Sequence, residues 1–336
     1  MLALVTGAAG FLGRRIVRRL VRGGATVRAL VRPGCAVDLP GAEVLAGDVC
    51  DESTVAEALR GADCVVHAAA RVATTGRWEE FAAVNVRATR RVLWAAHAAG
   101  VRRIVHISSL SVYAVPADGV TLTEDSPYES ESEARGAYSR SKLAADRVAM
   151  DAARRGVPVV VLRPGLLYGP GRRPPLARQS LTVNGFKFLL ARPDYCLPMT
   201  HVDNVADAVW LAAHTDAAVG QAFTVVDENV RQADYALQYR TAAGETWRAV
   251  FLPVTAVAWG ARAVEYGCRA LRRRPPVTYH QVQRATRSAY YDCARAATVL
   301  GWRPSISVAD GLREVFASLR ETVPSPTTPA TSVGAV

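Results

Sequence analysis

Short apolar runs alternate with helical patterns over the first two-thirds of the chain. A repeat of buried strand and amphipathic helix is typical of a parallel sheet with helices on both faces. The pattern therefore predicts an α/β fold, with a doubly wound parallel sheet of the Rossmann type. We expect strands at Leu2–Thr6, Thr26–Val31, Glu43–Ala46, Cys64–His67, Arg103–Ile107, Pro158–Leu162 and Ala222–Val226.

Helices fill most of the gaps between these strands. In the first gap, apolar residues recur at helical spacing, so one face of this helix is expected to lie on the sheet. They are Phe11, Leu12, Ile16, Val17 and Leu20.

The alternation fails between Gly171 and Thr200, where Arg, Pro and Leu dominate, and a helix resumes after His201. We interpret this segment as an insertion from which the chain returns to the sheet. After Asp227 the pattern predicts a helix, then a strand at Trp247–Leu252, an apolar helix at Phe251–Leu271 and a final helix at Val308–Leu319. The expected division is a large domain of 1–170 plus 201–226, a smaller C-terminal region of 171–200 plus 227–322, and a disordered tail at 323–336.

A glycine-rich turn joins the first strand to the first helix. Gly7, Gly10 and Gly13 stand in this turn. Glycine allows a tight turn and the close approach of a diphosphate, and the N–H groups at a helix start attract the anion. The context predicts a dinucleotide-binding site in the large domain, which makes the smaller region the candidate substrate-binding part.

The end of the second strand bears on which dinucleotide is bound. A site for NAD(H) usually has an acidic residue about twenty positions after the glycines, where it holds the adenosine ribose. Val31 stands at that place, with Arg32 beside it. A 2′-phosphate would find a cation and no repelling carboxylate, so NADP(H) is favoured and NAD(H) is the alternative.

A second group of residues contains the candidate catalytic side chains. Tyr138 and Lys142 are four residues apart in a helical segment and so share one helix face. The pKa of tyrosine is ordinarily about 10, and a nearby ammonium group that favours phenolate makes tyrosine a usable proton shuttle. Ser108 and Ser109 follow the strand Arg103–Ile107, at the sheet edge where open α/β folds bind ligands.

Together these segments resemble the extended short-chain dehydrogenase/reductase superfamily, which includes nucleotide-sugar epimerases, dehydratases and 3β-hydroxysteroid dehydrogenases. The resemblance covers nearly the whole chain. The segments that carry it are Thr6–Gly13, Gly47–Val49, Val66–Ala70, Asn85–Thr89, His106–Tyr113, Arg163–Gly171, His201–Val205 and Gly301–Pro304.

The resemblance implies an NAD(P)-dependent oxidoreductase in which hydride passes between the nicotinamide and a hydroxyl or keto carbon. Tyr138 would be the acid/base, and Lys142 would bind the nicotinamide ribose and lower the tyrosine pKa. Ser109 would hold the substrate oxygen, with Ser108 as the alternative. The expected cofactor contacts are Gly7, Gly10, Phe11, Leu12, Gly13, Arg32, Asp48, Val49, Ala68, Ala69, Tyr138, Lys142 and Pro164.

The substrate is left open between two enzyme hypotheses. An apolar 3β-hydroxysteroid-like or β-keto acid-like substrate is favoured by the segment Tyr138–Asp146 and by the apolar helix Phe251–Leu271. The alternative is a nucleotide-sugar epimerase or reductase, whose diphosphate would use arginines in the insertion. Sugar 4,6-dehydration is not expected, because Leu110 and Ser111 stand where those enzymes carry an Asp-Glu pair.

A third hypothesis is a non-catalytic NADP-sensing regulator on the same fold. An intact Ser109, Tyr138 and Lys142 disfavours it, since a regulator has no need of a proton relay. Arg172 and Arg173 are candidates for meeting an anionic substrate group, with solvated loop arginines as the equal alternative.

The amino-acid composition limits the kinds of binding partner that we expect. The 336-residue chain has a net charge of +11, but its arginines are scattered and no basic block is interleaved with aromatics, so no nucleic-acid partner is expected. The six cysteines show no metal-ligand spacing, and we expect His67, His106 and His201 to be structural, so no metal is expected. The first strand starts at Leu2, which leaves no room for a signal peptide, and we expect a cytoplasmic homodimer.

The apolar helix allows two interpretations. Arg262, Glu265 and Arg269 interrupt it, so it does not read as a membrane span. Lining a substrate pocket is the simpler role, and peripheral membrane contact through 251–271 is the alternative, helped by the basic run at 272–274.

Overall fold

The computed structural model describes residues 1–73, 76–115, 117–130, 136–172, 174–175, 180–189, 192–251, 253–271 and 287–322. The expected tail at 323–336, the basic run at 272–274 and the candidate Arg173 lie outside the described residues.

A seven-stranded parallel sheet forms the centre of the larger part, in the order β3-β2-β1-β4-β5-β7-β12. The predicted fold class is confirmed, and the predicted strand ends differ from the observed ones by one or two residues at most. Strand order reverses between β1 and β4, and such a crevice at the carboxyl ends of parallel strands is where these folds bind ligands. The strands are β1 (Leu2–Thr6), β2 (Thr26–Val31), β3 (Ala42–Ala46), β4 (Cys64–His67), β5 (Arg103–Ile107), β7 (Val159–Pro164) and β12 (Ala222–Val225).

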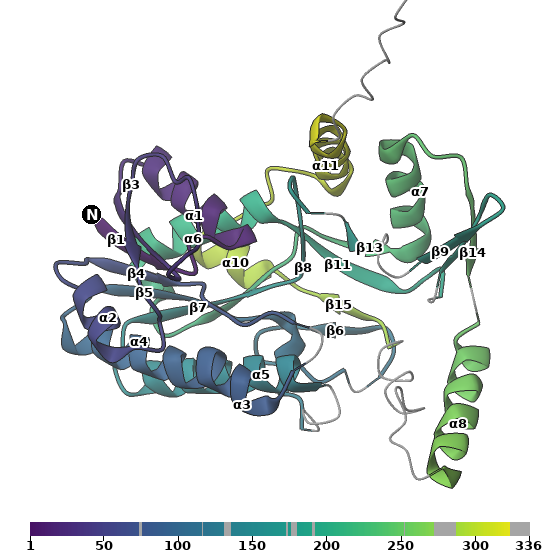
Figure 1. The fold of residues 1–336 in the computed structure, drawn as a ribbon, viewed down its shortest axis with the longest axis horizontal. Helices are drawn as coiled ribbons and strands as arrows, with labels where there is room; N and C mark the ends of the chain where they lie inside the picture. The colour runs from purple at the N-terminus through teal and green to yellow at the C-terminus, as the bar shows by residue number, and fades with distance from the viewer. Residues whose placement is uncertain are drawn as a thin grey trace, which may run out of the picture.

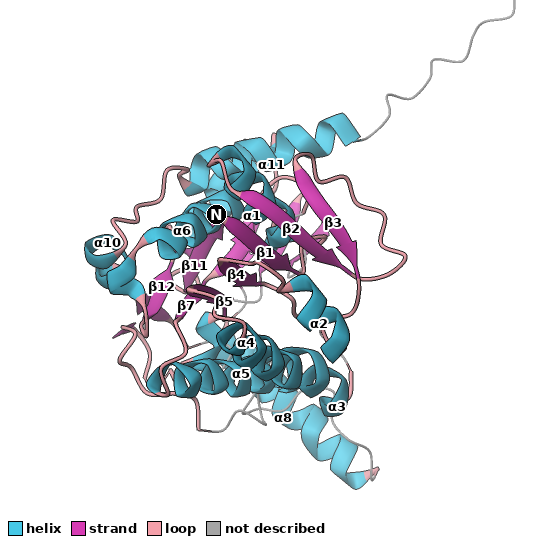
Figure 2. Ribbon diagram, turned by 90° about the vertical axis from the view of Figure 1, so that its left-hand side faces the viewer, coloured by secondary structure: helices cyan, strands magenta, loops and turns pink. Residues whose placement is uncertain are grey.

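Helices cover both faces of this sheet (Figure 2). On one face lie α1 (Phe11–Arg22) and α6 (Val202–His214), and on the other lie α2 (Glu52–Ala58), α4 (Ala88–Ala98) and α5 (Gly136–Arg154). The predicted apolar face of α1 is buried, with Ile16 and Leu20 fully covered. The short helices on these faces are α3 (Trp78–Phe81), η5 (Asp216–Ala218), α10 (Ala294–Val299), the π-helix η1 (Ala82–Arg87) and the 3-10 turn η2 (Leu110–Val112).

Smaller sheets form the other part of the molecule (Figure 1). One has the order β14-β10-β9, a second β13-β11-β8, and a third pairs β15 with β6. Helices α7 (Gln232–Ala243) and α11 (Val308–Thr322) share a hydrophobic core with the second of these sheets. The strands are β6 (Val120–Leu122), β8 (Leu166–Tyr168), β9 (Ser180–Val183), β10 (Phe186–Leu189), β11 (Cys196–His201), β13 (Glu228–Arg231), β14 (Arg248–Phe251) and β15 (Ala289–Tyr291).

The segment Gly171–Thr200, in which the sequence pattern placed no strand, contains regular strands. The structure has β9, β10 and most of β11 there. Asn184 and Gly185 join β9 to β10 with φ values of 48° and 76°. Two successive positive φ angles define the tight turn that suits a hairpin, and the dipeptide Asn-Gly is the strongest short-range sequence signal for such a turn.

Apart from the sheets stands α8 (Val254–Ala270), the predicted apolar helix, which projects from the smaller part in Figure 1. Trp259, Tyr266 and Leu271 on it and at its end are 65%, 59% and 71% exposed. None of the helices in the described ranges has both the length and the hydropathy that crossing a bilayer requires.

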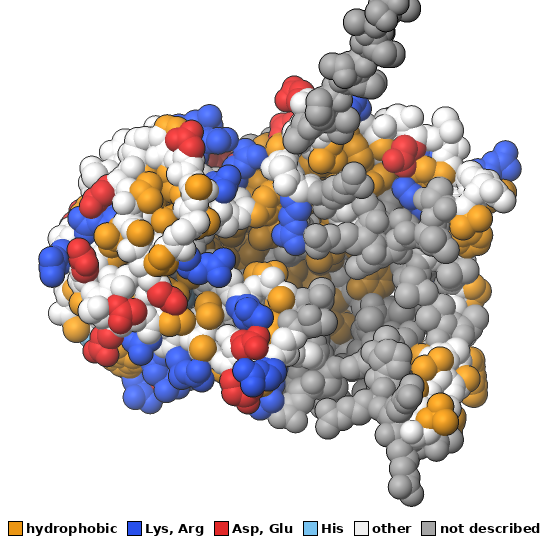
Figure 3. All heavy atoms as spheres, viewed as in Figure 1, with side chains coloured by type: hydrophobic (Ala, Val, Ile, Leu, Met, Phe, Trp, Pro, Cys, Tyr) orange, Lys and Arg blue, Asp and Glu red, His pale blue; other side chains and the backbone are white. Residues whose placement is uncertain are grey.

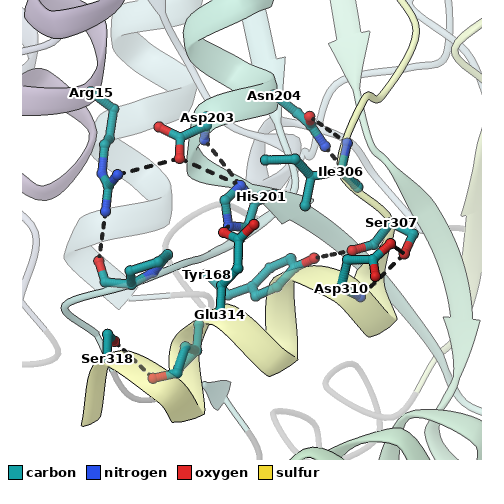
Figure 4. A network of polar contacts seen from close by, with 12 residues as sticks. Arg15, Tyr168, His201, Asp203, Asn204, Ile306, Ser307, Asp310, Glu314 and Ser318 are labelled. Atoms are coloured by element: carbon teal, nitrogen blue, oxygen red, sulfur yellow. Dashed lines mark hydrogen bonds and ion pairs between the residues drawn. The ribbon is translucent and has the colours of Figure 1, made fainter. Parts of the chain in front are cut away.

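A polar cluster lies between α11 and the helices α1 and α6, which cover the large sheet (Figure 4). Arg15 of α1 pairs with Asp203 of α6 at 3.3 Å, and Glu314 of α11 lies 3.6 Å from Nε2 of His201. The Tyr168 hydroxyl donates to the carbonyl of Ser307 at 3.4 Å. The cluster therefore connects residues from the two parts of the chain.

Candidate active site

The phosphate turn is built so tightly that side chains are excluded. Gly7 has a φ of +70°, and a Cβ there would lie 2.7 Å from the Cα of Ala69. A Cβ on Gly13 would lie 2.1 Å from the carbonyl oxygen of Gly7. Glycine is required at both positions, because contacts below 3 Å force the backbone apart.

The start of α1 offers donors to an anion. Gly10 is the N-cap residue and no side chain caps the helix, whose first turn has no acidic residue. The first N–H groups of a helix have no partner within it, and the helix dipole favours negative charge there. Phe11 is partly buried and Leu12 is buried, so their backbones are firmly held at this turn. These residues fit the diphosphate of a dinucleotide.

Arg32, Asp48 and Val49 follow the carboxyl ends of the paired strands β2 and β3. The N–H of Gly47 donates to the carbonyl of Val31 at 2.8 Å, which links the segment after β3 to the end of β2. Arg32 and Asp48 are exposed, whereas Val49 is buried. Asp48 already accepts the N–H of Cys50 at 2.8 Å, which fixes the direction of its carboxylate.

Ala68, Ala69 and Pro164 stand at the carboxyl ends of β4 and β7, the two strands that flank β5. Ala68 and Ala69 follow β4, and the N–H of Ala69 donates to the Thr6 hydroxyl at 3.3 Å. Pro164 ends β7 and is buried. Since β1, β4, β5 and β7 adjoin one another, these residues share one edge of the sheet with the glycine turn and the serines after β5.

The structure brings Ser109 and Tyr138 together through a hydrogen bond between their side chains. Ser109 comes directly after β5 and is half-buried, and its hydroxyl also accepts the N–H of Ser111 at 3.1 Å. Tyr138 is in the first turn of α5. Ser108, the alternative, is buried and donates its hydroxyl to Asp146 instead. Of the two serines, Ser109 is therefore the one in contact with the tyrosine.

Lys142 lies one turn further along α5 and is buried. Its Nζ donates to the carbonyl of Ile107 at 2.7 Å. Burial lowers the pKa of Lys142 to about 8, although the carboxylate of Asp146 opposes this effect. The ammonium group therefore titrates close to the physiological range.

The electrostatics of Tyr138 differ from the sequence-based expectation, in which Lys142 lowers its pKa. Burial raises the pKa of Tyr138, and the opposing effects come from the hydrogen bond with Ser109 and from the charge of Arg172. Arg172 follows β8, and its guanidinium lies 5.5 Å from the ring centre of Phe11. The charge of Arg172 is thus one of the effects that oppose the rise, whereas Nζ of Lys142 donates to the carbonyl of Ile107.

Two residues next to this site were given no functional role from the sequence. Asp146 follows Lys142 by four positions on the same helix face, and Arg163 is in β7; their charged groups are 2.8 Å apart and buried. A carboxylate at four-residue spacing after Tyr138 and Lys142, together with an arginine inside an apolar strand, was the available signal. Charged residues are rarely buried unless paired.

Two of the histidines, His67 and His106, are buried opposite each other in β4 and β5. His67 hydrogen-bonds to Thr6 at 2.8 Å and Thr89 at 2.9 Å, and burial lowers its pKa to about 3. The ring of His106 stacks on it with centroids 5.5 Å apart. Within the described parts of the chain, no three His, Cys, Asp or Glu residues are grouped as metal ligands.

Comparison with known proteins places this site in a family. The model of the NAD dependent epimerase/dehydratase family matches residues 3–225. A 2-alkyl-3-oxoalkanoate reductase of Shewanella oneidensis is 29% identical over 94% of this chain and 86% of its own. A 3 beta-hydroxysteroid dehydrogenase/Delta 5-->4-isomerase of Mycobacterium tuberculosis is 30% identical over 93% of this chain and 88% of its own.

A solved structure gives the same result. MoeE5 in complex with UDP-glucuronic acid and NAD superimposes with a TM-score of 0.74, at 26% identity over 96% of this chain and 100% of that one. The chain therefore belongs to the NAD dependent epimerase/dehydratase family, and it is an NAD-dependent oxidoreductase of the extended short-chain dehydrogenase/reductase type.

Proposed function

We propose that this enzyme moves hydride at a hydroxyl or keto carbon of an apolar substrate, of the 3β-hydroxysteroid or β-keto acid class, with Tyr138 as the acid/base. The observation that carries the proposal is the hydrogen-bonded pair of Ser109 and Tyr138, with Lys142 buried one turn along α5. In this arrangement one hydroxyl holds the substrate oxygen while the other gives or takes its proton.

Each remaining part of the site has a proposed role. The turn at Gly7, Gly10 and Gly13 and the N-terminus of α1 would hold the diphosphate. The other cofactor contacts would be Phe11, Leu12, Asp48, Val49, Ala68, Ala69, Pro164, Tyr138 and Lys142, the last at the nicotinamide ribose. When bound, the nicotinamide supplies or accepts the hydride.

The relatives support an apolar substrate, because two of them are named for oxoalkanoates and for a hydroxysteroid. The alternative is a nucleotide-sugar epimerase or reductase. The MoeE5 complex with UDP-glucuronic acid supports this alternative, as does the position of Arg172 near Tyr138, where a cation would meet an anionic group.

A substrate panel tests the proposal. We would follow nicotinamide absorbance with a 2-alkyl-3-oxoalkanoate, a 3-ketosteroid and a UDP-hexose, for the wild type and for Tyr138→Phe. Turnover of an apolar ketone that falls by a factor on the order of 10³ or more in Tyr138→Phe is expected. The matched control is Tyr290→Phe, at an exposed tyrosine of β15, which should leave turnover unchanged. Turnover of the UDP-hexose alone would favour the alternative.

We also propose that NADP(H) is preferred over NAD(H). Arg32 is exposed at the end of β2, and the adjacent Val31 offers no carboxylate to a ribose hydroxyl. Fluorescence titration with NADPH and NADH should show that NADPH binds more tightly. Arg32→Ala should weaken NADPH binding by roughly tenfold or more, because a charged partner of the phosphate is removed. Equal affinities in the wild type would contradict the preference.

Contact of α8 with a membrane surface is a further part of the proposal. The exposed Trp259 and Tyr266 flank Arg262, whose guanidinium lies 5.8 Å and 5.9 Å from their ring centres. Figure 3 shows orange side chains gathered on this helix, whereas charges of both signs are interspersed on the larger part. Aromatic groups with arginine suit the lipid headgroup region. Sedimentation with vesicles containing phosphatidylserine should be lost in Trp259→Ser/Leu271→Ser, and unchanged sedimentation would exclude this contact.

We propose, in addition, a cytoplasmic homodimer in which 1–170 plus 201–226 bind the cofactor and 171–200 plus 227–322 bind the substrate. Light scattering during gel filtration tests the dimer, for which twice the mass of one chain is expected.

A further inference from the structure

The end of β5 and the helix α5 contact each other through three successive strand-end residues. One contact is from a lysine to a backbone carbonyl, and the other two are made by serine hydroxyls. These contacts pair Ile107 with Lys142, Ser108 with Asp146 and Ser109 with Tyr138. The contact between Ser108 and Asp146 is the central one of the three. It does not involve Tyr138 or Lys142, but Ser108 is adjacent in the strand to the two residues that contact them.

Asp146 is fully buried, and both of its oxygens are hydrogen-bonded twice. Oδ1 accepts the Ser108 hydroxyl and Nε of Arg163, the latter at 3.0 Å. Oδ2 accepts the Tyr128 hydroxyl at 2.7 Å and Nη2 of Arg163 at 2.8 Å. A buried carboxylate with four donors has one favourable orientation, because any movement leaves a polar group without a partner.

Arg163 extends this network to β7 and beyond. Its Nη1 donates to the Tyr113 hydroxyl at 2.8 Å and to the carbonyl of Glu124 at 3.2 Å. Its side chain is 2% exposed, so the pair with Asp146 is shielded from solvent. The carboxylate therefore connects α5 with two strands of the sheet at once.

We propose that Asp146 is a positioning residue for the proton relay: by holding Ser108, its carboxylate sets the register between β5 and α5 that brings Ser109 to Tyr138. The inference rests on the proposed function, in which these two hydroxyls act on the substrate. A shift of about 1 Å between such groups costs up to about a hundredfold in rate.

The same carboxylate has an electrostatic effect on Lys142. Among the described residues, the titratable groups that interact with this ammonium are Asp146 on its own helix, His67 of β4 and His106 of β5, and Arg163 of β7 pairs with Asp146. Burial keeps both histidines neutral at pH 7, because it lowers their pKa values. Asp146 is the group that favours the charged form of Lys142.

Two variants distinguish the effect of Asp146 on the register between β5 and α5 from the effect of its charge on Lys142. Ser108→Ala removes the contact between strand and carboxylate but leaves the carboxylate and its ion pair in place. We expect kcat to fall on the order of tenfold to a hundredfold, with cofactor affinity and the pH profile unchanged. Asp146→Asn removes the charge of the carboxylate, so Lys142 loses its proton more readily. The alkaline limb of the pH–rate profile should therefore move to lower pH.

Separate measurements check that the variants fold. Asp146→Asn leaves Arg163 buried without a counter-charge, so circular dichroism and urea unfolding accompany the kinetics. If it does not fold, Ser108→Ala alone tests the inference. Asp151→Asn is the matched control, since this exposed carboxylate on the same helix pairs only with Arg154 and Arg155 among the described residues and should leave kcat unchanged.

The outcomes decide between positioning and simple structural support. If Ser108→Ala keeps kcat within about twofold and the folded charge variant keeps the wild-type pH profile, the inference is wrong. If Tyr138→Phe retains full turnover, the failure belongs to the proposed relay instead. A reduced kcat in Ser108→Ala, at unchanged stability, would support the register role.

Discussion

Tyr138 shows how a residue can be found in the sequence while its environment cannot. The four-residue spacing from Lys142 predicted the shared helix face, and the two side chains do lie one turn apart on α5. The direction of the ammonium group was not predictable, because it depends on the carbonyl of Ile107, on a strand 35 residues earlier. Arg172 reaches the tyrosine from a loop whose path no local pattern specifies.

A prediction at this scale follows for Arg172→Leu. Loss of this cation removes an effect that lowers the pKa of Tyr138, so the pKa rises further. Alcohol oxidation needs the tyrosine as a base, and the acidic side of its pH profile should therefore move to higher pH. At pH 7 we expect the oxidation rate to fall by less than about tenfold.

The measurement is kcat for oxidation between pH 6 and 10, with Arg154→Gln as the control. Arg154 is an exposed arginine at the other end of α5, paired with Asp151 at 3.4 Å. An unchanged profile for Arg172→Leu would mean that this arginine does not act on the relay.

Among whole elements, the phosphate turn was the most predictable and the hairpin of the insertion the least. The turn has glycines with a fixed spacing between a buried strand and an amphipathic helix, and each of these features is visible locally. The strands β9 and β10 have four residues each, too few for alternation to stand out. Only Asn184-Gly185 marked them, because those two residues accept the positive φ angles of the turn.

The turn predicts different results for two alanine substitutions. Gly10 is exposed with an ordinary φ of −70°, and a Cβ there meets only the carbonyl of Gly7, at 3.1 Å. Gly10→Ala should therefore fold normally but bind the dinucleotide about tenfold or more weakly, because its methyl group occupies the approach to the backbone. Gly13→Ala should lower the free energy of unfolding by at least about 1–3 kcal/mol, because its methyl group would overlap the carbonyl of Gly7.

Thermal unfolding and a cofactor titration of both variants give the two quantities. Normal affinity in a folded Gly10→Ala would place the diphosphate elsewhere. A fully stable Gly13→Ala would mean that the turn can relax.

At the scale of the whole molecule, the division of the chain was harder to predict than the central sheet. The inner strands of that sheet are mostly apolar because both of their faces are buried, and this makes them visible in the sequence, whereas the edge strand β3 is largely exposed. The connections between the two parts are not visible in this way. They depend on single polar residues such as Asp227, which lies between β12 of the large sheet and β13 of the smaller one.

Asp227 predicts how stability depends on pH. Burial raises its pKa from 3.8 to about 7, and the N–H of His201 donates to its Oδ2. A carboxyl group whose pKa is raised by folding contributes stability below its unfolded pKa, and this contribution is lost as the pH rises toward 7 and above. Asp227→Asn should remove this loss and be more stable than the wild type at pH 8, by on the order of a few kcal/mol.

Urea unfolding at pH 5 and pH 8 measures this difference. Glu57→Gln, at an exposed carboxylate of α2, is the control and should leave the pH dependence unaltered. If Asp227→Asn is destabilised equally at both pH values, the carboxyl group is not the source of the effect.

The pairing of β15 with β6 also limits how the chain can be assembled and exchanged. Ala289 pairs with Val120, so a segment near the C-terminus completes a sheet begun in the first half of the chain. A nascent chain must therefore leave the ribosome at least as far as Tyr291 before this contact closes. For the same reason, a single recombination point between relatives would not transfer the smaller part intact. A functional chimera would need matched segments from both sides of the central sheet.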